Sequence, residues 1–275
     1  MNSLTLYPFF YGAKPRIIGH RGAKGEAPEN TPPSFRRAFE DGAGFIELDV
    51  RGTKEGEVVI IHDATLERTT NGRGRVSRQS LKELKALDAG YWFTIDGGKT
   101  FPYRGQKIAI PALQELFSSF PEVKAIIEIK QARPSMVKGV IEIIRRARKE
   151  EQVLLATEMD QIMKEVRRDL QAYRLPIATG FSYGEVADFM SWLAGGRRDR
   201  YTPPGQAFQI PCDYNGMTLV NEQTLEAAHE LGIEMFVWTV NDIGEMARLL
   251  ELGVDGIITD YPARMRGLVL KSSHE

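Results

Sequence analysis

Two pairs of charged residues, spaced to share one face of a strand, are the part of the sequence best suited to chemistry. Glu47 and Asp49 lie within the apolar stretch GFIELDV, and Glu128 and Lys130 repeat the spacing within KAIIEIK. Residues i and i+2 of a strand point to the same side, so each pair projects together. Three carboxylates brought to one place would repel one another and raise one another's pKa values. Positive charge must therefore balance them.

The source of that positive charge is limited by composition. The chain has a single cysteine, Cys212, so it can build neither a thiolate zinc site nor a disulfide framework. Mg²⁺ and Ca²⁺ prefer oxygen ligands, so we expect the three carboxylates to bind one divalent cation, Mg²⁺ or Ca²⁺. The alternative is an internal ion pair of these carboxylates with Lys130 and Arg21.

Two histidines could exchange protons beside the carboxylates. His20 ends a predicted strand and is followed by Arg21, and His62 ends the extension after the second strand and is followed by Asp63. Two imidazoles on adjacent rim positions can act as general acid and general base, although a single histidine at a strand end is more often structural. Arg21 and Lys130 bring positive charge to the same rim, which suits a phosphodiester anion or balances the carboxylates.

Eight apolar segments must position these side chains. They alternate with amphipathic segments of helical period, which predicts βα units around a parallel sheet. The clearest of these helical segments are residues 34–42, 136–151, 160–170, 224–232 and 243–253. We expect an α/β fold, a (β/α)8 TIM barrel, whose active sites lie at the carboxyl ends of the strands. An open doubly wound sheet is the alternative, but about six strands suffice there and no Gly-rich phosphate fingerprint opens a helix. The predicted strands are residues 16–20, 44–50, 124–130, 153–157, 176–181, 207–211, 234–240 and 256–260.

Residues 64–110 interrupt this alternation. The segment is rich in Gly, Arg, Thr and aromatic residues, and a structureless loop of that length is uncommon in a compact domain. We therefore expect one domain over residues 1–275, with a small inserted subdomain after the second strand that caps the barrel. Its aromatic residues should form the subdomain's own core, or alternatively cover a lipid or a headgroup. These aromatic residues are Tyr91, Trp92, Phe93, Phe101 and Tyr103.

Charge and hydropathy exclude some partners. The formal net charge is −1, with acidic and basic residues interspersed, so no general basic field favours nucleic acid or an anionic membrane. No apolar run approaches 18 residues, and the first residues lack a basic start followed by an apolar core. We expect a cytoplasmic protein without stable membrane insertion, and the sequence leaves its oligomeric state open.

Several motifs, in order along the chain, resemble those of the glycerophosphodiester phosphodiesterase family. They are GHRGAKGEAPENTPPSF, IELDVRGTKEGEVVIIHDATLERTTNGRG, AIIEIK, VWTVND and VDGIITDYP, and together they span nearly the whole chain. The most specific parts are His-Arg-Gly with the downstream Glu-Asn-Thr, Glu-x-Asp, and His-Asp followed by Arg-Thr-Thr-Asn-Gly. The resemblance implies a (β/α)8 barrel with an insertion after the second strand. It also implies metal-dependent hydrolysis of glycerophosphodiesters to glycerol 3-phosphate and an alcohol.

The resemblance implies roles for the catalytic residues. Glu47, Asp49 and Glu128 would hold the divalent ion, and His20 and His62 would exchange protons. One imidazole would take the proton of the attacking hydroxyl, and the other would protonate the departing alcohol. The first nucleophile is either water or the neighbouring glycerol hydroxyl, which would give a cyclic phosphate.

The same resemblance implies how the small-molecule substrate is held. Arg21 and Lys130 would meet its phosphate. Glu29, in the Glu-Asn that follows the first strand, would orient Arg21 or a histidine. Trp238 would form an apolar wall against the glycerol, although a core tryptophan is the alternative.

One departure from the family pattern affects the expected substrate. The fourth strand is followed by Glu158-Met159, where many members of the family place Ser-Phe, so one side of the pocket is altered and the alcohol accepted is left open. A lysophospholipase D or a phospholipid-cleaving lyase on the same barrel is one alternative function. A non-catalytic barrel that binds phosphorylated ligands is another.

Overall fold

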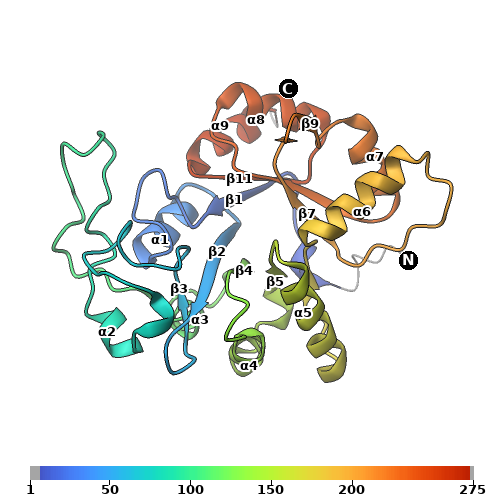
Figure 1. The fold of residues 1–275 in the computed structure, drawn as a ribbon. Coiled ribbons are helices and arrows are strands. Elements are labelled where there is room, and N and C mark those ends of the chain that lie inside the picture. The colour runs from blue at the N-terminus through green and yellow to red at the C-terminus, as the bar shows by residue number, and fades with distance from the viewer. Residues whose placement is uncertain (1–6, 273–275) are drawn as a thin grey trace.

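The computed structural model describes residues 7–272 and has the predicted (β/α)8 architecture, with helices around a ring of strands (Figure 1). The parallel strands follow the order β6-β5-β4-β2-β1-β11-β10-β7, and a single bridge between Gly180 and Ala207 joins β6 to β7. The eight predicted strands and the TIM-barrel fold class are confirmed. The barrel strands are β1 (Arg16–His20), β2 (Phe45–Gly52), β4 (Ala125–Ile129), β5 (Val153–Ala156), β6 (Ala178–Thr179), β7 (Ala207–Ile210), β10 (Glu234–Val237) and β11 (Gly256–Thr259).

Alternation along these strands decides which side chains enter the barrel. Ile18, Phe45 and Ile126 belong to the apolar cluster that fills the barrel's interior, whereas their neighbours Ile17, Ile46 and Ile127 pack in the larger cluster that includes the helices' apolar residues. Side chains on one face of a strand recur at every second residue. The next residues on the interior face are therefore His20 on β1, Glu47 and Asp49 on β2, and Glu128 on β4. The polar residues therefore continue the interior face toward the carboxyl ends of the strands. 

The other end of the barrel is closed by apolar side chains. The 3-10 turn η2 (Pro8–Phe10) inserts Phe9 and Phe10 into the interior cluster. Arg16 is fully buried there, with its guanidinium 5.8 Å from the centre of the Phe10 ring and Nη1 2.5 Å from Glu234 Oε2. This closure leaves the carboxyl ends of the strands as the open mouth.

Nine α-helices lie within the described residues. Five of them lie where the sequence pattern indicated helices, around residues 34–42, 136–151, 160–170, 224–232 and 243–253. The helix α6 and the C-terminal helix α9 lie outside these five segments. The helices are α1 (Pro32–Glu40), α2 (Leu81–Lys85), α3 (Leu113–Ser119), α4 (Val137–Ala147), α5 (Asp160–Tyr173), α6 (Tyr183–Ala194), α7 (Glu222–Glu230), α8 (Ile243–Leu252) and α9 (Pro262–Ser272).

The segment 64–110 folds around apolar residues of its own. It follows β3 (Val58–Ile60), which pairs antiparallel with β2, and it contains α2 and the 3-10 turn η3 (Val76–Arg78). A separate buried cluster joins β3 to this segment, and Tyr103 packs against it. Trp92 is 46% exposed, so not all of the aromatic residues are in that core. The buried members of the cluster are Val59, Ile61, Leu66, Val76, Leu84, Ala89, Ile108 and Ile110.

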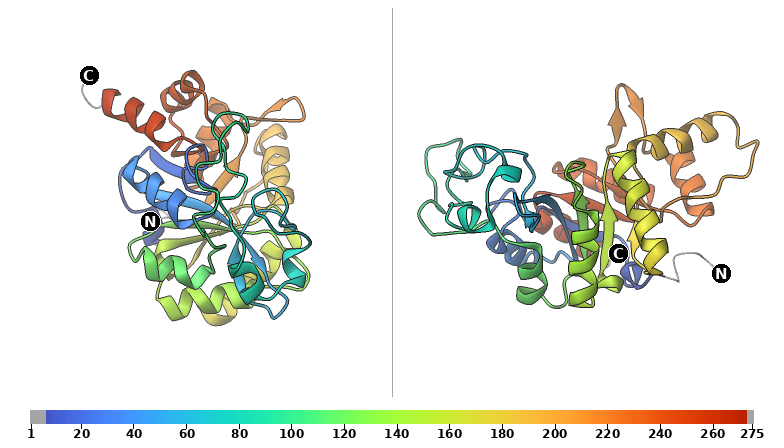
Figure 2. Two further views of the ribbon diagram at one scale, coloured as in Figure 1. Left: turned by 90° about the vertical axis from the view of Figure 1, so that its left-hand side faces the viewer. Right: turned by 60° about the horizontal axis from the view of Figure 1, so that its bottom comes forward.

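A short hairpin after β7 was also absent from the predicted elements. It consists of β8 (Asp213–Tyr214) and β9 (Met217–Thr218). Strands of two residues are too short for an alternating pattern to reveal. Figure 2 shows the hairpin and the segment 64–110 projecting from different parts of the molecule. Between residues 7 and 272, none of the helices has the length and apolar character required to cross a membrane.

Candidate active site

Three carboxylates from two adjacent strands meet in the mouth of the barrel. Glu47 and Asp49 lie on β2, and the strand register places Asp49 opposite Glu128 on β4. Carboxylate oxygens of the three residues lie within 4.8 Å of one another. Burial raises the pKa of Glu47 well above its usual value, and the charges of Asp49 and Glu128 raise it further. Burial also raises the pKa of Glu128. Both carboxyl groups therefore favour their protonated forms unless further positive charge lies near them.

Two cations partly balance these carboxylates. Arg21 Nε lies 3.1 Å from Asp49 Oδ2, and Lys130 Nζ lies 2.7 Å from Glu128 Oε1 and 3.6 Å from Asp49 Oδ1. The ion pairs anticipated as an alternative to a metal are thus present, but two cations face three carboxylates. Three clustered oxygen donors also fit the ligand preference of Mg²⁺ or Ca²⁺. The residues present can therefore accommodate a divalent ion.

Each of the two predicted catalytic histidines is held by an aspartate. His20 Nδ1 lies 2.6 Å from Asp260 Oδ1, and His62 Nδ1 lies 2.6 Å from Asp63 Oδ1. His20 Nε2 lies 4.0 Å from Glu47 Oε2, so this ring edge faces the carboxylate cluster. A carboxylate at Nδ1 favours the tautomer that carries its proton there and leaves Nε2 available.

Burial makes the neutral form of both imidazoles more stable. It lowers the pKa of His20, against the opposing effect of the hydrogen bond to Asp260. It also lowers the pKa of His62, against the opposing charge of Asp49. Neutral imidazoles are the form that can accept a proton from a hydroxyl group.

The strand β3 brings His62 to the carboxylates. Ile61 N donates a hydrogen bond of 2.9 Å to Asp49 O, so the chain after β3 runs beside the end of β2. Arg51 Nε donates a hydrogen bond of 2.6 Å to His62 O and so fixes the backbone of His62. The short antiparallel strand β3 therefore positions His62. The sequence pattern indicated this strand only as an extension after the second strand.

Asp260 and Asn241 were not among the predicted site residues. Asp260 follows β11, which pairs with β1, and Asn241 follows β10. Asn241 Nδ2 donates to Asp260 Oδ2 at 2.9 Å, and Asp260 N donates to Asn241 Oδ1 at 2.9 Å. Once a closed barrel is assumed, a carboxylate directly after the last strand must lie near the end of the first. That reasoning could have identified Asp260 as a partner of His20.

Arg68 was also missed, and it connects the segment after β1 to the segment after β3. Its guanidinium donates two hydrogen bonds of 2.7 Å to Glu29. The Oε1 atom of Glu29 also accepts a hydrogen bond of 2.8 Å from Arg21 Nη1. The same guanidinium contacts Asp63 through Nε at 2.6 Å. Burial alone would raise the pKa of Glu29, but the hydrogen bonds and charges of Arg68 and Arg21 together outweigh it and lower the pKa to about 2. Arg21, Glu29, Arg68, Asp63 and His62 thus form one continuous chain of contacts.

The turn after β1 presents its polar atoms to the carboxylates. Arg21 and Asn30 both have positive φ angles, 52° and 59°. Arg21 N donates to Glu47 Oε2 at 3.1 Å, and Asn30 Nδ2 donates to Asp49 Oδ2 at 2.9 Å. Asn30 is buried and therefore fixes the orientation of Asp49 rather than meeting solvent.

Trp238 and His229 lie in different surroundings. Trp238 directly follows β10 and is 40% exposed, so it is not part of the packed core. His229 lies on α7 and places Nε2 2.8 Å from Asp255 Oδ2. His274 lies outside the described residues.

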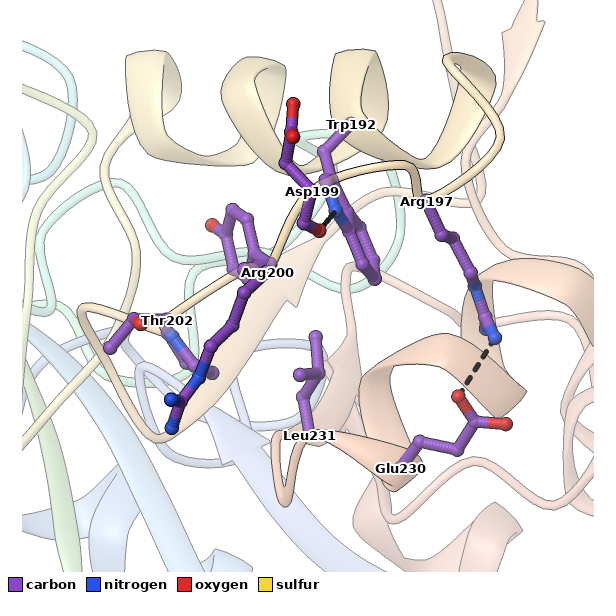
Figure 3. A pocket seen from close by; sticks show the side chains of 9 residues that line it. Trp192, Arg197, Asp199, Arg200, Thr202, Glu230 and Leu231 are labelled. Carbon is purple, nitrogen blue, oxygen red and sulfur yellow. Dashed lines mark hydrogen bonds and ion pairs between the residues drawn. The ribbon is translucent and has the colours of Figure 1, made fainter.

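A separate open cavity of about 490 Å³ is lined by the end of α6, the loop that leads to β7 and the end of α7 (Figure 3). Arg197 Nη1 lies 2.8 Å from Glu230 Oε2 across it, and Trp192 Nε1 donates to Asp199 O. The lining residues lie at the ends of α6 and α7 and in the loop before β7. These segments lead to the amino ends of the following strands, so the cavity faces the end of the barrel opposite the carboxylates. None of the predicted site residues lines this cavity.

Comparisons with known proteins agree with the barrel fold. The model of the glycerophosphoryl diester phosphodiesterase family matches residues 20–264. A glycerophosphodiester phosphodiesterase of Caldanaerobacter subterraneus is 35% identical over 94% of this chain and 99% of its own length. A lysophospholipase D of Mus musculus is 28% identical over 91% of this chain and 85% of its own. The crystal structure of a putative glycerophosphoryl diester phosphodiesterase from Silicibacter pomeroyi superposes with a TM-score of 0.77 at 26% identity, covering 98% of this chain and 97% of that one.

Proposed function

The chain belongs to the glycerophosphoryl diester phosphodiesterase family, and from this premise we propose that it hydrolyses glycerophosphodiesters with one divalent cation and two histidines. It is a phosphoric diester hydrolase, and the proposed products are glycerol 3-phosphate and an alcohol. The observation that carries the proposal is the meeting of three carboxylates and two imidazoles in one barrel mouth.

Glu47, Asp49 and Glu128 are the proposed ligands of the cation, which is Mg²⁺ or Ca²⁺. The support is their clustering within 4.8 Å and the raised pKa of the buried Glu47, which nearby positive charge would relieve. A bound divalent ion supplies positive charge to the phosphate oxygens as the diester is attacked. Asn30 keeps Asp49 oriented by its hydrogen bond of 2.9 Å.

His20 and His62 are the proposed groups that move protons. The Nε2 atom of one neutral imidazole accepts the proton of the attacking hydroxyl. The other imidazole enters the step protonated, having taken a proton from solvent, and its Nε2 gives that proton to the oxygen of the departing alcohol. Asp260 and Asp63 hold the two Nδ1 atoms, which keeps each Nε2 as the exchanging nitrogen. The attacking hydroxyl belongs to water or to the glycerol itself.

The substrate phosphate is proposed to bind between Arg21 and Lys130. An arginine fork and an ammonium group suit its non-bridging oxygens, on which charge develops during attack. Glu29 accepts from Arg21 Nη1 at 2.8 Å and is the proposed orienting group for that fork. Trp238, exposed beside the carboxyl end of β10, is the proposed apolar wall against the glycerol.

A lysophospholipid is the second candidate substrate, and the similarity to the mouse lysophospholipase D favours including it. Exposed apolar side chains also occur on segments after the barrel strands, among them Met159 and Met217. Parallel assays with glycerophosphocholine and lysophosphatidylcholine, with and without EDTA, separate the two substrates. Activity that resists EDTA would contradict the proposed cation.

His20→Ala and His62→Ala test the proton transfers. Each variant should lower kcat by about 10²–10⁴-fold with a modest change in KM, since binding groups are retained. His229→Ala is the matched control, because His229 also contacts an aspartate but lies on α7. Near-normal kcat in both test variants would show that these histidines do not transfer the protons.

A further inference from the structure

A fourth carboxylate lies beside the proposed phosphate-binding lysine without an assigned role. The register of β4 and β5 pairs Glu128 with Ala156, so two residues further along each chain Lys130 and Glu158 are neighbours. Lys130 Nζ lies 3.3 Å from Glu158 Oε1. The Glu158 side chain is 71% exposed, so its carboxylate stands at the solvent side of the mouth.

Charge balance does not account for Glu158. Lys130 is only 13% exposed and already contacts Glu128 at 2.7 Å and Asp49 at 3.6 Å. One ammonium group therefore serves three carboxylates, and Glu158 adds negative charge where Lys130 is already compensated. A substrate that brings its own cation to this position would meet an attractive charge.

Two exposed tyrosines lie on segments beside the loop that carries Glu158. Tyr183 N donates a hydrogen bond of 2.9 Å to Glu158 O, which places the start of α6 against the loop after β5. The Tyr183 ring lies 5.6 Å from that of Tyr214 on the hairpin β8–β9, and the residues are 58% and 44% exposed. Aromatic faces attract ammonium groups, and a carboxylate nearby adds its own attraction for the same cation.

We propose that Glu158, with Tyr183 and Tyr214, forms a subsite for the ammonium group of the alcohol part of the substrate. This inference rests on the proposed function, because it needs the phosphate to lie at Lys130. The phosphate then meets Lys130 and Arg21, and a cation two carbons from the ester oxygen extends toward Glu158. A diester with a neutral alcohol lacks this attraction, so the subsite selects amino alcohols by charge.

The selectivity can be measured with two diesters that differ in one charge. Glycerophosphocholine carries a quaternary ammonium group on its alcohol, and glycerophosphoglycerol carries none. Both diesters share the phosphate and the glycerol, so the change in the ratio of their kcat/KM values from wild type to variant reports how the substituted residue treats the cationic alcohol. Glu158→Gln should lower this ratio by about fivefold to tenfold, which corresponds to ~1 to 1.4 kcal/mol.

Two further variants and a control complete the experiment. Glu158→Lys should lower the ratio further, because it places a like charge at the subsite. Tyr183→Ala should lower it by about twofold to fivefold, as expected for an exposed cation–π contact. The control is Glu142→Gln on α4, since Glu142 is 56% exposed and pairs with Arg146 at 2.5 Å, away from the strand ends. It should leave the ratio unchanged.

The outcomes separate this inference from the proposed function. If both Glu158 variants change the two kcat/KM values by the same factor, Glu158 acts only through Lys130 and the subsite does not exist. A ratio that falls in the glutamine variant and again in the lysine variant supports the subsite. A wild-type enzyme that hydrolyses neither diester overturns the proposed function and this inference together.

Discussion

Replacing Arg68 with alanine should destabilise the fold and impair catalysis, because Arg68 joins two carboxylates, one on the segment after β1 and one directly after β3. Its guanidinium contacts Glu29 and Asp63, which in turn contact Arg21 and His62. Arg68 is 46% exposed, so water screens its charge, whereas the Glu29 side chain is 9% exposed. The energetic effect is therefore best worked out from Glu29.

The pKa of Glu29 gives the magnitude. Burial alone would raise it, but the hydrogen bonds from Arg68, followed by the charge of Arg21, lower it from 4.5 to about 2. At ~1.4 kcal/mol per pH unit, that lowering corresponds to about 3 kcal/mol of stability at pH 7. Arg68 contributes the larger part, so Arg68→Ala should lower the free energy of unfolding by about 2 kcal/mol.

The pH dependence of this loss follows from the sign of the change. A carboxyl group with a lowered pKa in the folded state stabilises the fold above its unfolded pKa, here 4.5, and the contribution disappears as pH falls toward 2. The difference in stability between wild type and Arg68→Ala should therefore be full at pH 7 and reduced by about half at pH 3. Urea unfolding at the two pH values measures it.

Arg248→Ala is the matched control for this measurement. Arg248 is 49% exposed and also makes a two-pronged contact with one carboxylate, Glu245, but that carboxylate is 34% exposed. The control should cost at most about 1 kcal/mol. Arg68→Ala should in addition lower kcat/KM by about tenfold, since groups that orient catalytic side chains have effects of that order. A loss no greater than that of the control, or a loss equal at pH 7 and pH 3, would refute this reasoning.

Three further predictions concern the mouth and the core. Asp260→Asn should lower kcat by about 10–100-fold with little change in KM, because the charged partner of His20 Nδ1 is lost; steady-state kinetics checks this, and an unchanged kcat would contradict it. Glu47→Gln should raise the Mg²⁺ or Ca²⁺ concentration needed for half-maximal activity by at least about tenfold, and an unchanged metal titration would place the ion elsewhere. Leu48→Ala should lower the free energy of unfolding by about 2–5 kcal/mol, because Leu48 is fully buried between sheet and helices; a loss below 1 kcal/mol by urea unfolding would contradict that packing.

The barrel and its acidic cluster could be predicted because alternation is a local property. In β2 the residues that follow Phe45 at steps of two are Glu47 and Asp49, so the sequence alone indicates that they share the face that fills the barrel. Repetition of the pattern before Glu128 then brings the third carboxylate to the same mouth once the strands are parallel neighbours. The proposed roles of these residues, and the division into one domain with an insertion at 64–110, remain predictions.

The partner of His20 could not be predicted from local alternation. His20 and Asp260 are separated by 240 residues, and only closure of the barrel between β1 and β11 makes them neighbours. Arg68 lies in a segment without regular period, so its direction depends on the packing of the separate apolar cluster beneath it. The hairpin that carries Tyr214 is too short to produce an alternating pattern.

The central claim is that the barrel mouth binds a divalent cation between the carboxylates of two strands and beside two imidazoles. Anomalous diffraction from crystals soaked in Ca²⁺ or Mn²⁺ tests it most directly. The account predicts one strong peak within about 2.0–2.6 Å of oxygens of Glu47, Asp49 and Glu128, and its loss in crystals of Glu47→Gln at the same ion concentration. A wild-type map with no peak at these oxygens, or with the ion bound at another place, would contradict the account.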